Sequence, residues 1–438
     1  MTYNFFKGHP TDSLYPSQDI VEATTKLLLS PNSNFDEKDP RNRHPLSYGS
    51  DEGAIWVRDE IAKFSNKIYQ PNAQTESDFL NLTNGSSYGV LNILLQSTLP
   101  HTNYTKQAFI ITPTYFLING TFIDAGFNGK LTAIDEKSNS IDLELLETKL
   151  KEFDSEESND SDTSIIQNPN SQLFNVSNKK KIYKFVLYCV PTFSNPGGET
   201  YDLETRLKLI ELARKYDMLI ITDEVYDLLD YVQPLDEFPS KFIPKITHLD
   251  RETNKDNNSF GNSIINSTFS KFIAPGLRVG YQETINKNLA YQLSEGGANV
   301  SGGTPSQLNS MIVGELLQNG KFKTIVNRFR SVYAERARLL KSLLIKNLPK
   351  GSKFTGFEGG YFQWVTLPSE YDTDKIVKEL GKEGVILAGG GHFEVTGDVR
   401  NWGKTSFRLS ISSLSLDEIE KGIELVGAKI KQLYPDLE

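Results

Sequence analysis

The chain has 438 residues, of which 38% are hydrophobic and 24% are charged, and its formal net charge is −9. This composition is ordinary for a globular protein with a large core, and the negative charge argues against nucleic acid and anionic membranes as partners. No apolar run is long enough to cross a bilayer, and the N-terminus lacks the pattern of a secretory signal. We therefore expect a cytoplasmic protein.

The few cysteine and histidine residues exclude two further classes of site. Cys189 is the only cysteine, so no internal disulfide can form, and its apolar run "FVLYCV" predicts a buried strand thiol. The five histidines are scattered without metal-ligand spacing, so we expect no metal site.

In chain order, the first strong signal is an amphipathic helix over residues 50–68, "SDEGAIWVRDEIAKFSNKI", with Ser50 as its N-cap. Four apolar runs follow that are typical of buried strands. They cover residues 107–112, 183–190, 218–222 and 263–269.

Between two of these strands, residues 201–217 predict a helix with Asp202 as N-cap. Its apolar spacing places four side chains on the inward face: Leu203, Leu207, Ile210 and Ala213. Alternating strands and helices predict an α/β fold with a mainly parallel central sheet and helices on both faces. Ligands of such sheets bind beyond the carboxyl ends of the strands.

The pattern changes after residue 300. Residues 305–346 predict a long helical region, which leads to "GGYFQWVTLP" and "SFRLSIS" and then to a last helix with a capping box of Ser415 and Glu418. We therefore predict a large domain over 46–300 and a smaller α+β domain formed by 1–45 and 301–438. Two polar insertions, near 153–181 and 250–262, are predicted to be solvated loops of the large domain.

Each predicted strand ends in residues that can carry chemistry. The ends are "NGSSYG" with Gly85, Ser86 and Ser87, "PTYF" with Tyr115, "PTFSNPGG" with Asn195, "DEVY" with Asp223 and Tyr226, and "STFSKFIAPGLR" with Thr268, Ser270, Lys271 and Arg278. Taken alone, most of these are helix caps, turns or rim aromatics. Asp223 is harder to dismiss, because a carboxylate that ends an apolar strand needs a cation, which could be a metal or a protonated nitrogen.

Taken together, these residues suit one cofactor. Glycine, hydroxyl and arginine groups can hold a phosphate, Lys271 can form a Schiff base with an aldehyde, Asp223 can pair with a ring N–H, and Tyr115 can stack on the ring. Pyridoxal 5'-phosphate needs all four of these functions.

The chain resembles the fold-type I, class I/II pyridoxal-phosphate aminotransferases, and within them the branch of 2-aminoadipate, kynurenine and multi-substrate enzymes. The resemblance rests on motifs that span nearly the whole chain in order: "YGSDEG", "TNGSSYG", "PTYF", "SNPGGETYDLETR", "ITDEVYDLL", "STFSKFIAPGLRVGY", "GGYFQWVTLP" and "SFRLSIS". The most specific of them is Ser-x-Lys followed by Ala-Pro-Gly-Leu-Arg.

The resemblance implies a role for each residue. Lys271 binds the cofactor covalently and shuttles a proton, Asp223 keeps the ring nitrogen protonated, and Tyr226 and Asn195 bond the ring hydroxyl. Phosphate binding falls to Ser86, Ser87, Thr268, Ser270 and Arg278, beside the turn at Gly85. Tyr48 is similar to the tyrosine that reaches the phosphate from the other subunit, which implies a homodimer with shared sites. Arg408 looks like the clamp for the substrate α-carboxylate, with Asn195 and Gly8 also on the substrate side.

Some positions depart from the family pattern. The usual Asn-Pro-Thr-Gly is Asn-Pro-Gly-Gly at 195–198, which we expect to change the turn and not the chemistry. The loop "GGGHFEVTGD" at 389–398 replaces a more usual Pro-Gly pair, and its His392 could contact substrate or simply be solvated. The longer N-terminal arm that relatives use over the site is missing before "FFKGHP".

The expected activity is transfer of an amino group from an L-amino acid, of the 2-aminoadipate or aromatic and kynurenine type, to a 2-oxo acid such as 2-oxoglutarate. Two alternatives stay open. A β-lyase or decarboxylase would use the same cofactor residues, and a non-catalytic regulator that binds the cofactor would normally carry a basic DNA-binding domain, which the charge of −9 disfavours.

Overall fold

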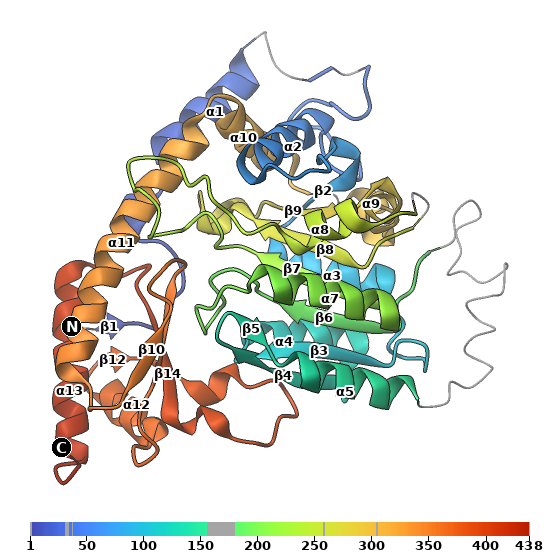
Figure 1. The fold of residues 1–438 in the computed structure, drawn as a ribbon. Coiled ribbons are helices and arrows are strands. Elements are labelled where there is room, and N and C mark those ends of the chain that lie inside the picture. Colours follow the sequence, from blue (N-terminus) through green and yellow to red (C-terminus); the bar gives the residue numbers. More distant parts are fainter. Residues whose placement is uncertain are drawn as a thin grey trace.

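The computed structural model describes residues 2–30, 35–36, 38–155, 180–256, 259–303 and 305–437. Its centre is an eight-stranded sheet with the order β2-β9-β8-β7-β6-β3-β4-β5 (Figure 1). The strands are β2 Leu80–Thr83, β3 Gln107–Thr112, β4 Leu131–Lys137, β5 Ser140–Ile141, β6 Phe185–Cys189, β7 Met218–Glu224, β8 Ser263–Thr268 and β9 Gly280–Thr284. The pairs from β4 through β3, β6 and β7 to β8 are parallel, whereas β9 is antiparallel to both β8 and β2.

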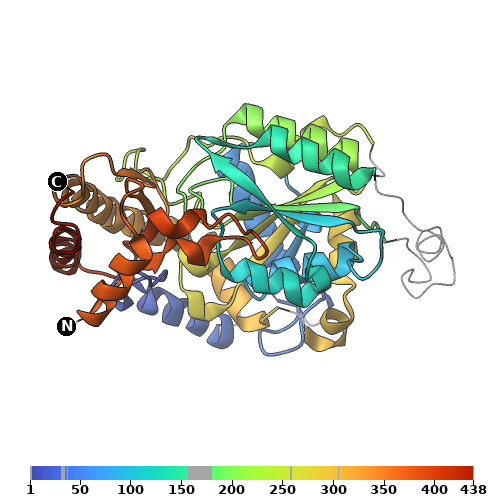
Figure 2. The ribbon, with the colours of Figure 1, turned by 90° about the horizontal axis from the view of Figure 1, so that it is seen from below.

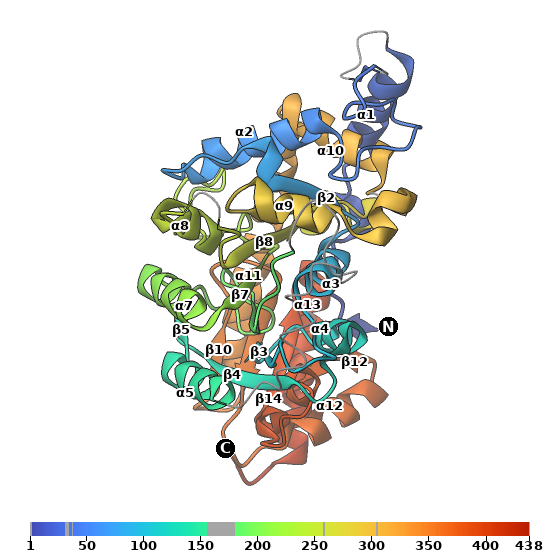
Figure 3. The same cartoon turned by 90° about the vertical axis from the view of Figure 1, so that its right-hand side faces the viewer.

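Helices cover both faces of this sheet, so it forms the middle layer in Figures 2 and 3. One face carries α5 Leu143–Asp154, α7 Leu203–Tyr216 and α8 Ile246–Thr253, and the other carries α3 Ser86–Ser97 and α4 Leu117–Phe122 (Figure 3). Strand residues alternate between the two cores. In β3, Phe109 packs on the α5 and α7 side, whereas Ile110 packs on the opposite side. Burial on both faces explains why these strands are continuously apolar in sequence.

A second, antiparallel sheet has the order β10-β11-β14-β13. Its strands are β10 Lys353–Thr355, β11 Phe362–Thr366, β13 Ala388–Gly389 and β14 Ser406–Ser410, and β1 Tyr3–Asn4 pairs separately with β12 Val385–Ile386. The remaining helices are α1 Ser17–Leu29, α2 Ile55–Tyr69, α9 Lys287–Ser294, α10 Gln307–Gln318, α11 Lys321–Asn347, α12 Thr373–Lys382 and α13 Leu416–Leu433. The long α11 runs beside the large sheet toward the small one (Figure 1).

Short helical turns complete the described chain. They are η1 Asp12–Leu14, η2 Ser77–Phe79, η3 Ile123–Phe127, η4 Phe269–Lys271, η5 Pro275–Leu277, η6 Asn299–Gly303, η7 Gly390–Phe393 and η8 Trp402–Thr405. No helix among the described residues combines the length and the apolar character needed to span a bilayer.

The predicted α/β class is confirmed, and most predicted elements lie where expected. Cys189 is a buried thiol on β6, as predicted. Asp202 caps α7 by accepting from the Thr205 N–H, and the Ser415–Glu418 capping box opens α13. The helical region at 305–346 is divided into α10 and α11 at Gly320, whose φ of 81° ends a right-handed helix.

Two details of the helix predictions were wrong. Ser50 does not cap the first long helix, because α2 begins at Ile55 and the Ser50 hydroxyl donates instead to the Gly53 carbonyl. In α7, Leu203 and Leu207 are 44% and 39% exposed, whereas Arg206 and Leu209 are buried. The buried face is rotated because Arg206 donates to the carbonyls of Tyr201, Pro191 and Pro244.

The polar insertions also differ from expectation. Residues 250–253 belong to α8, and the Asp250 carboxylate is buried, where it accepts from Arg214, the Asn262 N–H and the Ser263 hydroxyl. Polar composition was misleading here because these side chains pair with one another inside the fold. Residues 257 and 258, and most of the insertion near 153–181 (156–179), lie outside the described residues.

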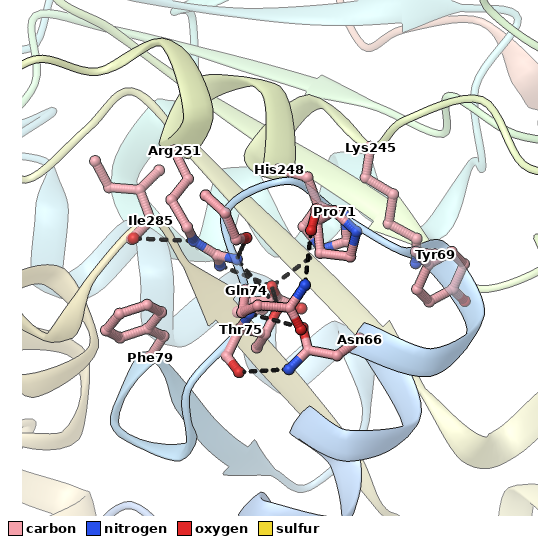
Figure 4. Close-up of polar contacts among 12 residues, drawn as sticks. Asn66, Tyr69, Pro71, Gln74, Thr75, Phe79, Lys245, His248, Arg251 and Ile285 are labelled. Carbon is pink, nitrogen blue, oxygen red and sulfur yellow. Dashed lines mark hydrogen bonds and ion pairs between the residues drawn. The ribbon is translucent and has the colours of Figure 1, made fainter.

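A second buried polar cluster joins α8 and β9 to the loop after α2 (Figure 4). Glu283 of β9 accepts from Arg251 at 2.7 Å and from Thr75 at 2.6 Å, and it lies 3.1 Å from the His248 ring nitrogen. Arg251 also donates to the carbonyls of Ile285 and Ala73. Every charged group of this cluster therefore has partners within the chain.

Candidate active site

Strand register brings the first set of predicted residues together. Gly280 of β9 pairs with Thr83 of β2 on one side and with Thr268 of β8 on the other. Residues 84–87 follow Thr83, residues 269–271 follow Thr268, and residues 275–279 precede Gly280. These three segments therefore meet at one edge of the sheet. A pocket of about 450 Å³ opens there.

One end of this pocket is built to receive an anion. Gly85 has a φ of 90°, and a Cβ at this position would lie 2.2 Å from Arg278 Nη2, so only glycine fits. The first helical hydrogen bond of α3 runs from the Gly89 N–H to the Gly85 carbonyl, which leaves the N–H groups of the first turn free to bind a ligand.

Hydroxyl groups and one cation complete this end. The Thr268 and Ser270 hydroxyls are 2.8 Å apart, and Arg278 Nη1 lies 3.4 Å from Ser270 Oγ. Ser86, Ser87 and Arg278 line the same pocket. Arg278 is exposed and has no carboxylate partner among the described residues. This combination of helix N-terminus, hydroxyls and guanidinium matches the needs of a phosphate.

Asp223, the penultimate residue of β7, faces the middle of the pocket. It is 6% exposed and accepts from Tyr188 and from Asn266, each at 2.8 Å. Burial raises the pKa of Asp223 to about 6, although Tyr188, Asn266 and Lys271 act in the opposite direction. Both direct partners are neutral, so the carboxylate lacks the cation that its burial calls for.

Lys271 follows β8 in η4 and is half-buried in the pocket. Its Nζ donates to the Gly8 carbonyl at 3.1 Å, and the ring of Tyr361 lies 5.4 Å away. Burial lowers the pKa of Lys271 to about 8; Arg408 and Arg278 lower it further, whereas Asp223 raises it. A lysine with this pKa is partly a free amine near neutral pH, as a nucleophile must be.

The small sheet supplies Arg408, in the middle of β14 and 3% exposed. Nη1 donates to Asn195 Oδ1 at 3.0 Å and Nη2 donates to the Phe6 carbonyl at 2.7 Å, while the buried Nε has no partner among the described residues. The guanidinium lies 3.9 Å from the Phe362 ring centroid. Burial lowers the pKa of Arg408 to about 10. A substrate carboxylate would supply the missing anion.

Tyr226, Asn195 and Tyr115 connect these groups. The Tyr226 hydroxyl hydrogen-bonds to Asn195, and burial raises the pKa of Tyr226. Tyr115 hydrogen-bonds to Ser87, and burial raises its pKa as well. All three side chains line the pocket.

Three other predicted residues lie in different surroundings. Gly8 lines the pocket, and a Cβ there would lie 2.7 Å from the Phe362 ring. Tyr48 is 76% exposed and does not line the pocket of its own chain. His392 is exposed and packs edge-on against Phe6, with ring centroids 5.9 Å apart.

Sequence reasoning missed several contributors. Tyr188 and Asn266 hold Asp223, and Asn266 could have been found as the amide inside the apolar run "SIINST", directly opposite Asp223 in the strand register. Phe6, Phe116 and Phe362 form aromatic walls of the pocket. Each lies in one of the sequence motifs "FFKGHP", "PTYF" and "GGYFQWVTLP", but no role was predicted for it, because these segments come together only in the folded chain.

The residues present fit pyridoxal phosphate on grounds visible in this structure. The turn at Gly85 can hold a phosphate. Asp223, whose direct partners are neutral, can pair with a protonated ring nitrogen, and the amine of Lys271 can react with an aldehyde. Among the described residues no cluster of histidine, cysteine and carboxylate side chains could hold a metal ion.

Comparisons with known proteins agree with this reading. The family model described as "Aminotransferase class I and II" matches residues 8–426. The uncharacterized protein YER152C of Saccharomyces cerevisiae is 55% identical over 436 residues, which cover 98% of this chain and 96% of that protein. The 2-aminoadipate transaminase of Thermus thermophilus is 30% identical over 251 residues, covering 56% of this chain and 57% of that protein. The solved structure of Pyrococcus horikoshii kynurenine aminotransferase matches with a TM-score of 0.74 and 25% identity, covering 99% and 91% of the two chains.

Proposed function

Because the chain belongs to the class I and II aminotransferases and is thereby a pyridoxal-phosphate-dependent transaminase, we propose that the pocket around Lys271, Asp223 and Arg408 is its active site. It exchanges an amino group between an L-amino acid and a 2-oxo acid. Two of the relatives described above are named as a 2-aminoadipate transaminase and a kynurenine aminotransferase, so the β-lyase and regulator alternatives are not favoured.

Each side chain has a defined task toward the cofactor. When bound, pyridoxal phosphate supplies an aldehyde that captures amino groups and a ring that accepts electrons. Lys271 would hold the aldehyde carbon covalently and, as a free amine, would move a proton at the substrate Cα. The phosphate is held by Ser86, Ser87, Thr268, Ser270 and Arg278.

Asp223 keeps a proton on the ring nitrogen. A charge-assisted hydrogen bond of this kind contributes about 1.5–3 kcal/mol, and it gives the buried carboxylate the cationic partner that the chain itself does not provide. Tyr115 would stack on the ring, while Tyr226 and Asn195 would bond the ring hydroxyl.

Arg408 binds the α-carboxylate of both substrates. The observation that carries this assignment is the unpaired, buried Nε–H beside two neutral partners. A carboxylate can accept from Nε and one Nη in a bidentate geometry, and this contact orients Cα toward Lys271.

The charge of the pocket favours substrates with a second carboxylate. Lys7 and His9 line it beside Lys271, Arg278 and Arg408, and Asp223 is its only acidic lining residue among those described. The aromatic walls suit long apolar stems. We therefore propose 2-oxoglutarate as acceptor and 2-aminoadipate or aromatic and kynurenine-type amino acids as donors, in line with the named relatives.

The proposed assembly is a cytoplasmic homodimer with shared sites. Tyr48 is 76% exposed next to Gly302, and Leu46 is 69% exposed. An exposed aromatic and a nearby exposed leucine suit a subunit interface better than contact with water, so Tyr48 would reach the phosphate of the partner's cofactor.

A half-reaction screen tests the proposal. The holoenzyme is mixed with one amino acid at a time, without any oxo acid, and the cofactor absorbance is followed. Conversion to the amine form by 2-aminoadipate, kynurenine or aromatic donors supports the proposal. Conversion only by other amino acids would refute the donor class, and release of ammonia without an oxo acid would point to a lyase.

A further inference from the structure

The turn after Asn195 contains two glycines, Gly197 and Gly198, and the backbone conformation requires glycine only at Gly198. Gly198 has a φ of 75°, and a Cβ there would lie 2.2 Å from the Gly356 Cα, so only glycine fits. Gly197 has no such φ, and this is the position at which the family pattern has threonine. A Cβ on Gly197 would lie 1.8 Å from Glu136 Oε2. The space that glycine leaves at 197 is therefore filled by a carboxyl group.

Glu136 reaches this turn from β4 and forms no ion pair with any residue that the structure describes. Its Oε1 is buried and has no hydrogen-bond partner in the part of the chain that the structure describes. The Ser194 side chain is its hydrogen-bond partner, and the Glu199 carboxylate acts on it electrostatically. Tyr201 and Cys189 also face it, from the loop after the turn and from β6. Burial, reinforced by Glu199, raises the pKa of Glu136 to about 8.

The turn that Glu136 touches carries an active-site residue. The Ser194 N–H donates to the Glu199 carbonyl at 2.9 Å, the Glu199 N–H donates to the Ser194 hydroxyl at 3.0 Å, and the Gly198 N–H donates to the Ser194 carbonyl at 2.8 Å. The next residue, Asn195, accepts from Arg408 and hydrogen-bonds to Tyr226. Glu136, Ser194 and Asn195 line one small cavity of about 10 Å³. A shift of the Ser194 side chain would therefore move Asn195 directly.

We propose that Glu136 is a positioning residue, whose carboxyl group fills the space left by Gly197 and holds Asn195 against Arg408 and Tyr226. This proposal rests on the role of Asn195 given above. The group that fills this space thus comes from β4 and not from the turn itself.

The protonation state of Glu136 makes the proposal testable. A neutral acid suits this enclosure, whereas the carboxylate would face Glu199 without a cation. As pH rises through about 8, ionisation of Glu136 should displace the turn and weaken substrate binding at Arg408. In the unfolded chain the pKa of a glutamate is ~4.3. Because the pKa of Glu136 is raised in the folded chain, the free energy of unfolding falls as pH rises from ~4.3 toward about 8.

The first test compares the substrate KM of wild type, Glu136→Gln and Asp135→Asn holoenzyme from pH 6 to 9.5. Asp135 is the matched control, because it neighbours Glu136 on β4 but pairs with Arg400 at the surface. We expect KM to rise above pH 8 in wild type and in Asp135→Asn but to stay flat in Glu136→Gln, which keeps the shape of the neutral acid. An equal rise in all three proteins would overturn the proposal.

The second test needs no activity, so it still applies if the proposed function fails. In cofactor-free protein, the thermal midpoint of wild type should fall relative to Glu136→Gln between pH 5 and pH 8. Gly197→Ala should destabilise the protein when Glu136 is present and have a clearly smaller effect in the Glu136→Ala background, where Ser194 Oγ at 3.0 Å is the remaining close contact of the new Cβ, because contacting residues are non-additive. Additive effects, or midpoints that run parallel with pH, would show that Glu136 does not occupy this space as an acid.

Discussion

Two buried carboxylates of the central sheet meet opposite environments. Glu283 contacts Arg251, His248 and Thr75 (Figure 4), whereas the direct partners of Asp223 are the neutral Tyr188 and Asn266. Burial alone would raise the pKa of both. In Glu283 the cationic partners outweigh burial and lower the pKa, whereas the pKa of Asp223 rises to about 6.

The two arginines repeat this contrast. Arg251 donates to Glu283 and to several carbonyls, whereas Arg408 has two neutral partners and a bare Nε. The Glu283 cluster stabilises the fold, because its charged side chains find their partners within the chain. A cluster that lacks one cation at Asp223 and one anion at Arg408 has room for ligands that supply these two charges. Substitutions should therefore change stability in the first region and chemistry in the second.

The largest effect is expected from Lys271→Ala in the incomplete region. Without the amine, the covalent cofactor absorbance should disappear and turnover should fall by several orders of magnitude. Absorbance spectra and initial rates measure both. Unchanged activity would contradict the assignment of Lys271, and a folded far-UV spectrum is the control.

Glu283→Gln should break the complete region. It leaves Arg251 and His248 beside a neutral group, and breaking a buried pair lowers the free energy of unfolding by about 3–5 kcal/mol. Because the folded pKa of Glu283 is lowered, its stabilisation is present above pH ~4.3 and is lost as pH falls below that value. Urea unfolding measures the change.

The control for Glu283 is Glu211→Gln. Glu211 pairs with Lys208 at the surface, and such pairs contribute about 0–1 kcal/mol. Equal losses of unfolding free energy in Glu283→Gln and Glu211→Gln would contradict the distinction between the Glu283 cluster and the pocket around Asp223 and Arg408. So would a large fall in kcat for folded Glu283→Gln enzyme, since this cluster lies away from the pocket lining.

Arg408→Ala should separate binding from folding. Loss of a buried charge contact with the substrate carboxylate costs about 2–5 kcal/mol, which corresponds to roughly 30- to several-thousand-fold in kcat/KM. Arg408→Lys is the matched variant, because it keeps the charge and loses the bidentate fork. A fall of less than about threefold in Arg408→Ala would show that another residue binds the carboxylate.

The smallest effect concerns Asp223→Asn in cofactor-free protein, and its sign is opposite to that of Glu283→Gln. The raised pKa means that ionised Asp223 destabilises the cofactor-free fold, with the loss developing from pH ~3.9 to about 6. Asparagine should therefore raise the free energy of unfolding by about 1–3 kcal/mol at pH 7, while turnover falls. A lower stability of Asp223→Asn would place Asp223 with Glu283 among structural carboxylates.

The sequence predicted the strands and the fold class well because burial on both sides leaves continuous apolar runs such as 218–222. It predicted the cofactor because Lys271, Asp223 and the Gly85 turn lie at the ends of strands. Such strand ends meet at one edge of the sheet, so a position at a strand end already indicates that these residues lie close together. The roles of these residues and the domain boundaries stay predictions.

Contacts between distant segments were not predictable in this way. The Glu283 cluster, the buried Asp250 and the pairing of Arg206 with backbone carbonyls all look like ordinary surface polarity in sequence. Apart from Tyr201, which lies 5 residues from Arg206, their partners lie 12 to 208 residues away in the sequence, and only the fold brings them together. The Asn195 turn is a similar case, since Gly197 is explained by a side chain from β4.

The strand pairing at Gly280 affects the stage of folding at which the enzyme can bind its cofactor. The phosphate end of the pocket exists only once β2 and β9 have paired, and Asn266 reaches the Ser86 carbonyl across 180 residues of sequence. Contacts of such long range form late in folding. The cofactor can therefore be captured only by a chain whose sheet edge is already closed, and recovery of its absorbance during refolding should lag behind recovery of helical signal.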